Sequence, residues 1–241
     1  MKTFELIPFG EKTLILRFDD VQEQPETIHW LNGFAAFLRS KYSKTFEDVL
    51  LSHLEINLVS KKNTDFKKVE KQVRLALTEY NNIDVDTACV WEIPACFDAE
   101  CAPDLDELFG GDQNKIDTYI QAFTAQELYV HFFGFLPGFA YLGGLPKELQ
   151  MPRKAHPRLA VPKGAVAVGG SYAAVYPQQS PGGWQLIGQT PFVFFDRNRM
   201  IPFFLKPGDR IRFKSISFLE YQQLDLDYQK ASFLPQKIEN K

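Results

Sequence analysis

Residues 131–146 read HFFGFLPGFAYLGGLP, and this stretch opens the part of the chain that decides the fold. Ten of the 15 glycines and eight of the 15 prolines lie between Gly134 and Pro191. Runs of β-forming residues separate these turn residues, at 165–168, 173–176, 185–187, 192–195 and 210–213. Many short strands joined by Gly/Pro turns are typical of a β-barrel or a β-sandwich.

The sequence upstream of this region alternates between strand and helix patterns. We predict strands at 3–9, 13–18, 49–59 and 87–93, and helices at about 25–42 and 65–80 with their apolar residues on one face. This ββαβαβ order predicts a small two-layer α/β domain over residues 1–93.

Pro94 marks the change between the two patterns. We predict a second domain over residues 94–215, which begins with two short helical pieces between 103 and 127, interrupted at Gly110-Gly111. Asp104, Asp106 and Glu107 are expected on the first turn and solvent face of the first piece. Residues 216–241 are polar with scattered apolar positions, and they predict a loose C-terminal tail. The predicted fold class is α+β, with a two-layer α/β domain followed by a β-barrel or β-sandwich domain.

The composition indicates an ordinary globular protein, with 45% hydrophobic and 24% charged residues in a chain of 241. A net charge of −3 gives no basic footprint for nucleic acid. Cys89, Cys96 and Cys101 lack both the even count of a disulfide framework and the spacing of a zinc site. No signal peptide and no apolar run long enough for a membrane span is recognisable, so we expect a cytoplasmic protein without membrane contact.

One stretch of the chain carries charge of a single sign. No Asp or Glu lies between Glu148 and Asp196, whereas four cations do: Arg153, Lys154, Arg158 and Lys163. Such an asymmetry favours a small anionic ligand, and Arg grips a carboxylate or phosphate with two parallel hydrogen bonds. We predict that Arg158 and Lys163 contact this anion. A solvated basic loop is the alternative interpretation.

Aromatic and glycine residues lie close to these cations in the sequence. We predict Tyr141, Tyr176 and Trp184 as walls of the ligand pocket. Gly138 and Gly183 are predicted to let the backbone approach the ligand closely, since a glycine carries no side chain at such a point. The alternative is an aromatic core with tight turns.

Sharper catalytic motifs do not occur. The sequence has no P-loop and no G-x-G-x-x-G, and Ser171 lies in G-G-S-Y-A rather than in G-x-S-x-G. The four histidines show no metal-ligand spacing. We therefore predict no metal site and no cofactor held by a recognisable motif, and no catalytic residue can be named from the spacing.

Four ordered strings add a resemblance: GFLPGFAYLGGLP at 134–146, PRLAVPKGAV at 157–166, VYP at 175–177 and SPGGWQLIGQTP at 180–191. They resemble the B-subunit family of ATP-dependent 5-oxoprolinase. This family is also called allophanate hydrolase subunit 1 or carboxyltransferase subdomain C and D, and it includes the sporulation kinase inhibitor KipI. The resemblance implies that the second domain is a cyclophilin-like β-barrel.

The resemblance also implies a function. A family member would be one subunit of a hydrolase, inactive alone, that acts with the C and A subunits in the ATP-driven opening of 5-oxoproline to glutamate. The complex would use the ATP. Two alternatives remain: an inhibitor that binds a sensor histidine kinase, as KipI does, or a subunit of urea or allophanate metabolism.

The chain departs from the family pattern at several positions. Where the family usually reads G-x-Q-T-G-[IV]-Y-P, residues 170–177 read GSYAAVYP, so that Tyr172 replaces a glutamine and Ala173 a threonine. Phe123 stands where a histidine is common. Tyr and Ala do not reproduce the hydrogen bonds of Gln and Thr, so the substrate does not follow from the resemblance alone.

Overall fold

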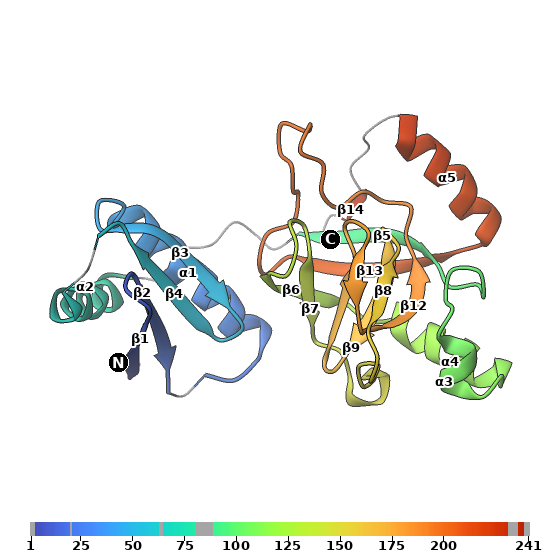
Figure 1. Ribbon diagram of the computed structural model, residues 1–241, viewed down its shortest axis with the longest axis horizontal. Helices are drawn as coiled ribbons and strands as arrows, with labels where there is room; N and C mark the ends of the chain where they lie inside the picture. Colours follow the sequence, from blue (N-terminus) through green and yellow to red (C-terminus); the bar gives the residue numbers. More distant parts are fainter. Residues whose placement is uncertain (1–2, 20, 63–64, 81–88, 231–235, 239–241) are drawn as a thin grey trace. The chain divides into compact units, whose positions relative to one another are not determined.

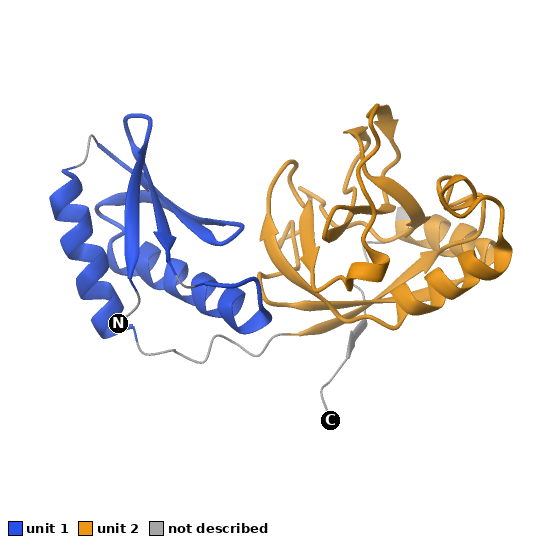
Figure 2. Cartoon of the chain, turned by 90° about the horizontal axis from the view of Figure 1, so that it is seen from below, with its two compact units in different colours: residues 1–88 blue, residues 89–241 orange. Residues whose placement is uncertain are grey.

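A computed structural model describes residues 3–19, 21–62, 65–80, 89–230 and 236–238. The chain divides into two compact units, Met1–Ala88 and Cys89–Lys241 (Figure 2). The division falls before the predicted boundary at 93, because strand β5 (Val90–Cys96) pairs in parallel with β13 (Arg210–Ile216) of the second unit. The predicted strand at 87–93 therefore belongs to the barrel unit, and its residues 87 and 88 lie outside the described residues.

The first unit is an antiparallel sheet covered by two helices (Figure 1). Its strand order is β1-β2-β4-β3. The elements are β1 (Phe4–Phe9), β2 (Thr13–Phe18), α1 (Pro25–Lys41), β3 (Phe46–Ser52), β4 (Glu55–Ser60) and α2 (Phe66–Glu79). In β2, Leu14, Leu16 and Phe18 are buried while their neighbours are more exposed, so one face of the sheet packs on the helices. This confirms the predicted two-layer domain.

One predicted strand of this unit is wrong. Residues 49–59 form parts of two strands, because the chain turns back after Ser52 and β3 pairs antiparallel with β4. His53 lies in the turn with φ of 57°, a conformation that non-glycine residues rarely adopt. No Gly, Pro or Asn lies at this turn. The apolar residues on its two sides therefore form one pattern, which predicts a single strand.

The second unit is built around a closed β-barrel (Figure 1). Its seven described strands follow the order β12-β9-β10-β7-β6-β13-β5, and pairing of Gln189 with Cys96 closes the ring. The other strands are β6 (Leu128–Phe133), β7 (Ala140–Gly143), β8 (Arg158–Val161), β9 (Ala165–Gly169), β10 (Tyr172–Val175), β11 (Ser180–Gly182) and β12 (Gln185–Gln189). The predicted α+β class with a barrel in the second domain is confirmed.

Side chains from all these ring strands fill the barrel, and two helices extend its core. The helices are α3 (Leu105–Phe109) and α4 (Gln113–Thr124). They confirm the prediction of two helical pieces interrupted at Gly110-Gly111. Gly110 ends α3 with φ of 63°. Phe123 of α4 stacks on Phe213 of β13, with ring centroids 5.5 Å apart, so this departure from the family pattern lies in the apolar core. A 3₁₀ turn, η1 (Lys147–Leu149), follows β7.

Two predictions for the C-terminal part are wrong. The expected loose tail at 216–241 contains helix α5 (Phe218–Lys230) and strand β14 (Gln236–Ile238), which pairs with β5. Asp98 accepts a hydrogen bond from the Phe218 amide at the start of α5. Residues 192–195 form no strand; Phe192 and Phe194 are instead buried in the barrel core, where Phe192 meets Tyr228 of α5. Among the described residues, no helix combines the length and the apolarity that a membrane span requires.

Candidate functional site

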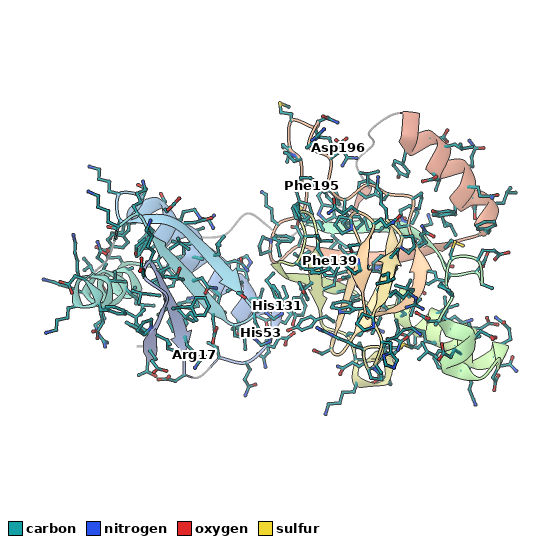
Figure 3. All side chains as sticks on the ribbon, in the orientation of Figure 1. Arg17, His53, His131, Phe139, Phe195 and Asp196 are labelled. Carbon is teal, nitrogen blue, oxygen red and sulfur yellow. The ribbon has the colours of Figure 1, made fainter. Side chains whose placement is uncertain are left out.

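The three predicted wall residues lie together on one face of the barrel sheet. In β9, Val166 and Val168 face the barrel core, whereas Ala165 and Ala167 face an aromatic cluster on the opposite side. Phe139, labelled in Figure 3, lies at the centre of this cluster. Its ring centroid is 5.1 Å from that of Tyr141, 5.2 Å from that of Tyr176 and 5.6 Å from that of Trp184. The structure thus brings Tyr141, Tyr176 and Trp184 together, and their contact with a ligand stays a prediction.

The phenols of Tyr141 and Tyr176 remain protonated near neutral pH. Burial raises the pKa of Tyr141 and of Tyr176, and the positive charge of Arg153 offsets only part of this effect. Tyr172, one of the departures from the family pattern, lies edge-on against Tyr141 with centroids 5.8 Å apart. These side chains are therefore suited to binding by ring contacts and hydrogen bonds, and unsuited to acting as bases.

Of the two predicted glycines, Gly138 has surroundings that leave no room for a side chain, whereas Gly183 does not. Gly138 has φ of 83°, and a Cβ there would lie 2.5 Å from Cβ of Phe195. The absence of a side chain at Gly138 therefore leaves room for Phe195, a residue of this protein rather than a ligand. A Cβ on Gly183 would meet Pro157 at 3.5 Å, an ordinary contact, so the structure gives no steric reason for glycine at this position.

Arg158 contacts Asp104, an acidic residue that the sequence predicts on the solvent face of the first helical piece. Its Nη2 donates to Oδ1 of Asp104, whose side chain is buried instead of facing solvent at the start of α3. Oδ2 of Asp104 accepts a hydrogen bond of 2.6 Å from the Leu186 amide. Nζ of Lys154 lies 3.0 Å from Oδ1 of Asp104, and this hydrogen bond raises the pKa of Lys154. The expected position of Asp104 is wrong, and its carboxylate balances cations of the acid-free stretch.

Lys163 lies in a different place from Arg158. It lines a cavity of about 560 Å³ with Gln189 and Thr190, next to Asp225 and Tyr228 of α5. Arg158 does not line this cavity. The two predicted anion contacts are therefore not brought into one pocket, and the helix that completes the Lys163 cavity was not predicted.

A second cavity, of about 410 Å³, collects other cations of the acid-free stretch. We call it the Arg153 cavity; its lining includes Glu107, Arg153, Lys154, His156 and Gln185. The guanidinium of Arg153 lies 5.6 Å from the ring centroid of Trp184, so the basic stretch and the aromatic cluster meet here. The basic residues of the run from Arg153 to His156 are the sequence signal for this site, which the predicted anion contacts Arg158 and Lys163 do not include. Among the described residues, no three His, Cys, Asp or Glu side chains gather as a metal site requires.

Comparisons with known proteins agree with the fold and with the sequence strings. Residues 4–205 match the family model described as carboxyltransferase domain, subdomain C and D. The chain is 31% identical over 231 residues to the 5-oxoprolinase B subunit of Bacillus subtilis, covering 90% of this chain and 95% of that protein. It is 44% identical over 122 residues to the 5-oxoprolinase B subunit of Escherichia coli O157:H7, covering 51% and 56% respectively.

A solved structure shares the fold. The crystal structure of TTHA0988 superposes with a TM-score of 0.69 at 28% identity, over 86% of this chain. The present chain spans 40% of the length of that one. Because the family model covers most of the chain and the Bacillus subtilis relative matches nearly all of it, the chain belongs to the family of 5-oxoprolinase B subunits.

Proposed function

We propose that this chain is the B subunit of a cytoplasmic, ATP-dependent 5-oxoprolinase complex, which acts with the A and C subunits to convert 5-oxoproline to glutamate. The observation that carries the proposal is the similarity to the 5-oxoprolinase B subunit of Bacillus subtilis, which extends over 95% of that protein. Both units of the present chain are thus represented in a relative that bears this name.

Two features support a role shared with other subunits. Tyr141 and Tyr176 of the aromatic cluster are protonated near neutral pH, so they suit ligand contact better than proton abstraction. The structural relative TTHA0988 is also much longer, since this chain covers 40% of it.

Reconstitution tests the proposal. The chain is co-expressed with the A and C subunits from the same genome, and glutamate release from 5-oxoproline is measured with and without ATP. We expect release only when all three subunits and ATP are present. Release no greater than that of the A and C subunits alone would reject the proposal.

The same preparation separates the proposal from its two alternatives. Pull-down with the tagged chain is expected to retain the C subunit. Retention of a sensor histidine kinase instead would favour the inhibitor, and turnover of urea or allophanate without turnover of 5-oxoproline would favour the third function.

A further inference from the structure

The Arg153 cavity has one wall from α3 and another from the chain between η1 and β8. Glu107 lies on the first wall, and Arg153, Lys154 and His156 lie on the second. Gln185, the first residue of β12, also lines the cavity. The cavity thus combines two cations, Arg153 and Lys154, with a neutral amide fixed on a barrel strand.

The cations of this cavity differ in whether an acidic residue pairs with them. Lys154 is held by Asp104 at 3.0 Å and by Glu107 at 3.3 Å. Arg153, by contrast, contacts the ring of Trp184 and has no ion pair with any residue that the structure describes. A guanidinium over a ring keeps its N–H edge available for an oxyanion. Arg153 is therefore the cation that can receive an incoming anion.

Gln185 presents an unmet hydrogen-bond acceptor. The residue is 6% exposed, and its Nε2 donates to the Pro152 carbonyl at 3.0 Å. Its Oε1 is buried and accepts no hydrogen bond from the described part of the chain. A buried acceptor without a partner is unfavourable, and an N–H or O–H group of a ligand would relieve this.

The position of Gln185 is fixed before any ligand arrives. Its backbone pairs with Val168 in the barrel sheet. The amide of the next residue, Leu186, donates to the buried carboxylate of Asp104. An acceptor held in this way loses little freedom on binding, which favours recognition of a donor at a defined place.

We propose that the Arg153 cavity binds a small carboxylate that also carries an N–H or O–H donor, with the carboxylate at Arg153 and the donor at Oε1 of Gln185. Glu107 in the lining disfavours a doubly charged phosphate, whereas a singly charged carboxylate tolerates it. The proposal rests on the proposed function, because it gives the isolated chain the binding site for the kind of ligand that the complex would process.

Three small molecules test the two contacts separately on the full chain by calorimetric titration. N-acetylglycine has both the carboxylate and an amide N–H. N-acetylsarcosine lacks the N–H, and N-acetylglycinamide lacks the charge. We expect N-acetylglycine to bind, and each of the other two to bind about tenfold more weakly or worse.

Variants assign the contacts to residues. Arg153→Ala is expected to weaken N-acetylglycine binding by about tenfold or more, and Arg197→Ala, an exposed arginine outside the cavity, is the matched control that leaves it unchanged. Gln185→Met is expected to remove the preference for N-acetylglycine over N-acetylsarcosine. If Gln185→Met does not fold, the Gln185 side-chain amide signals in the NMR spectrum of the unaltered chain are followed, and they are expected to shift with N-acetylglycine.

Three results would overturn the proposal, and the first two are equal affinity for N-acetylglycine and N-acetylsarcosine, or an unchanged affinity in Arg153→Ala. Absence of N-acetylglycine binding to the unaltered chain would also reject it. Because the A and C subunits are left out, this binding can fail while the complex still releases glutamate, and it can persist when the complex is inactive. Failure of the site and failure of the proposed function are therefore distinguished.

Discussion

Nη2 of Arg158 donates a hydrogen bond to Oδ1 of Asp104, a residue 54 positions earlier in the chain. Asp104 also binds the Leu186 amide and Lys154, so one buried carboxylate joins the start of α3 to β8, to β12 and to the segment before β8. This contact ties Arg158 into the barrel unit through Nη2, and its predicted contact with an anion stays a prediction.

Removing the carboxylate of Asp104 is therefore expected to lower the free energy of unfolding. Asp104→Ala would leave two cations and one backbone amide without their shared partner. We expect the free energy of unfolding in urea to fall by about 2–4 kcal/mol, below the full cost of breaking a buried pair because both cations are partly exposed. Asp106→Ala, on the exposed side of α3, is the control with a change of about 0.5 kcal/mol or less. Similar losses in the two variants would contradict the structural role of Asp104.

The example of Asp104 shows what a single sequence conveys and what it does not. The absence of acidic residues between Glu148 and Asp196 was visible, but the carboxylate that compensates these cations comes from an earlier segment. No spacing rule links residues so far apart. The aromatic cluster could be predicted in part, because Tyr141 and Trp184 lie near glycines and Tyr176 lies beside Pro177, in a region of short strands.

The fold predictions are also right where the signal is local, and wrong where an element depends on contacts with distant parts of the sequence. The strands β9, β10 and β12 lie between turn residues, and their predicted ends agree with the observed ends to within two residues. Helix α5 has no strong apolar stripe, and its packing depends on Phe192, far away in the sequence. The β3–β4 hairpin lacks turn residues at His53-Leu54, so the local signal for it is weak.

A pair of glycines tests the packing between the Gly138 turn and Phe195. Both Gly138 and Gly170 have positive φ, so alanine strains the backbone at each and costs about 1 kcal/mol. Only at Gly138 does the new Cβ also overlap a neighbour, which adds about 1–3 kcal/mol. Urea unfolding of Gly138→Ala and Gly170→Ala measures the difference. Equal losses would show that Phe195 moves aside freely.

The stability of the barrel unit should depend on alkaline pH through Tyr221 of α5. Burial raises the pKa of this phenol from 10.0 to about 12. The unfolded phenol ionises first as pH rises, so this contribution to stability is complete below pH 10 and is lost between pH 10 and about 12. Tyr221→Phe has no ionisable group, and its melting temperature should fall less steeply over this range. Parallel curves for the two proteins, recorded by circular dichroism, would contradict the partial burial of Tyr221.

Lys163 and Arg153 line different cavities, so single substitutions decide which cavity receives a carboxylate. The Lys163 cavity also contains Asp196 and Asp225, whose negative charges oppose an anion there. We therefore expect Lys163→Ala to change the affinity for N-acetylglycine by about twofold or less, as for a cation screened by solvent, whereas Arg153→Ala removes a direct partner. Titrations at two ionic strengths distinguish a direct contact from a general effect of net charge, because only the latter disappears in high salt. Weaker binding in Lys163→Ala with unchanged binding in Arg153→Ala would place the carboxylate beside α5 instead.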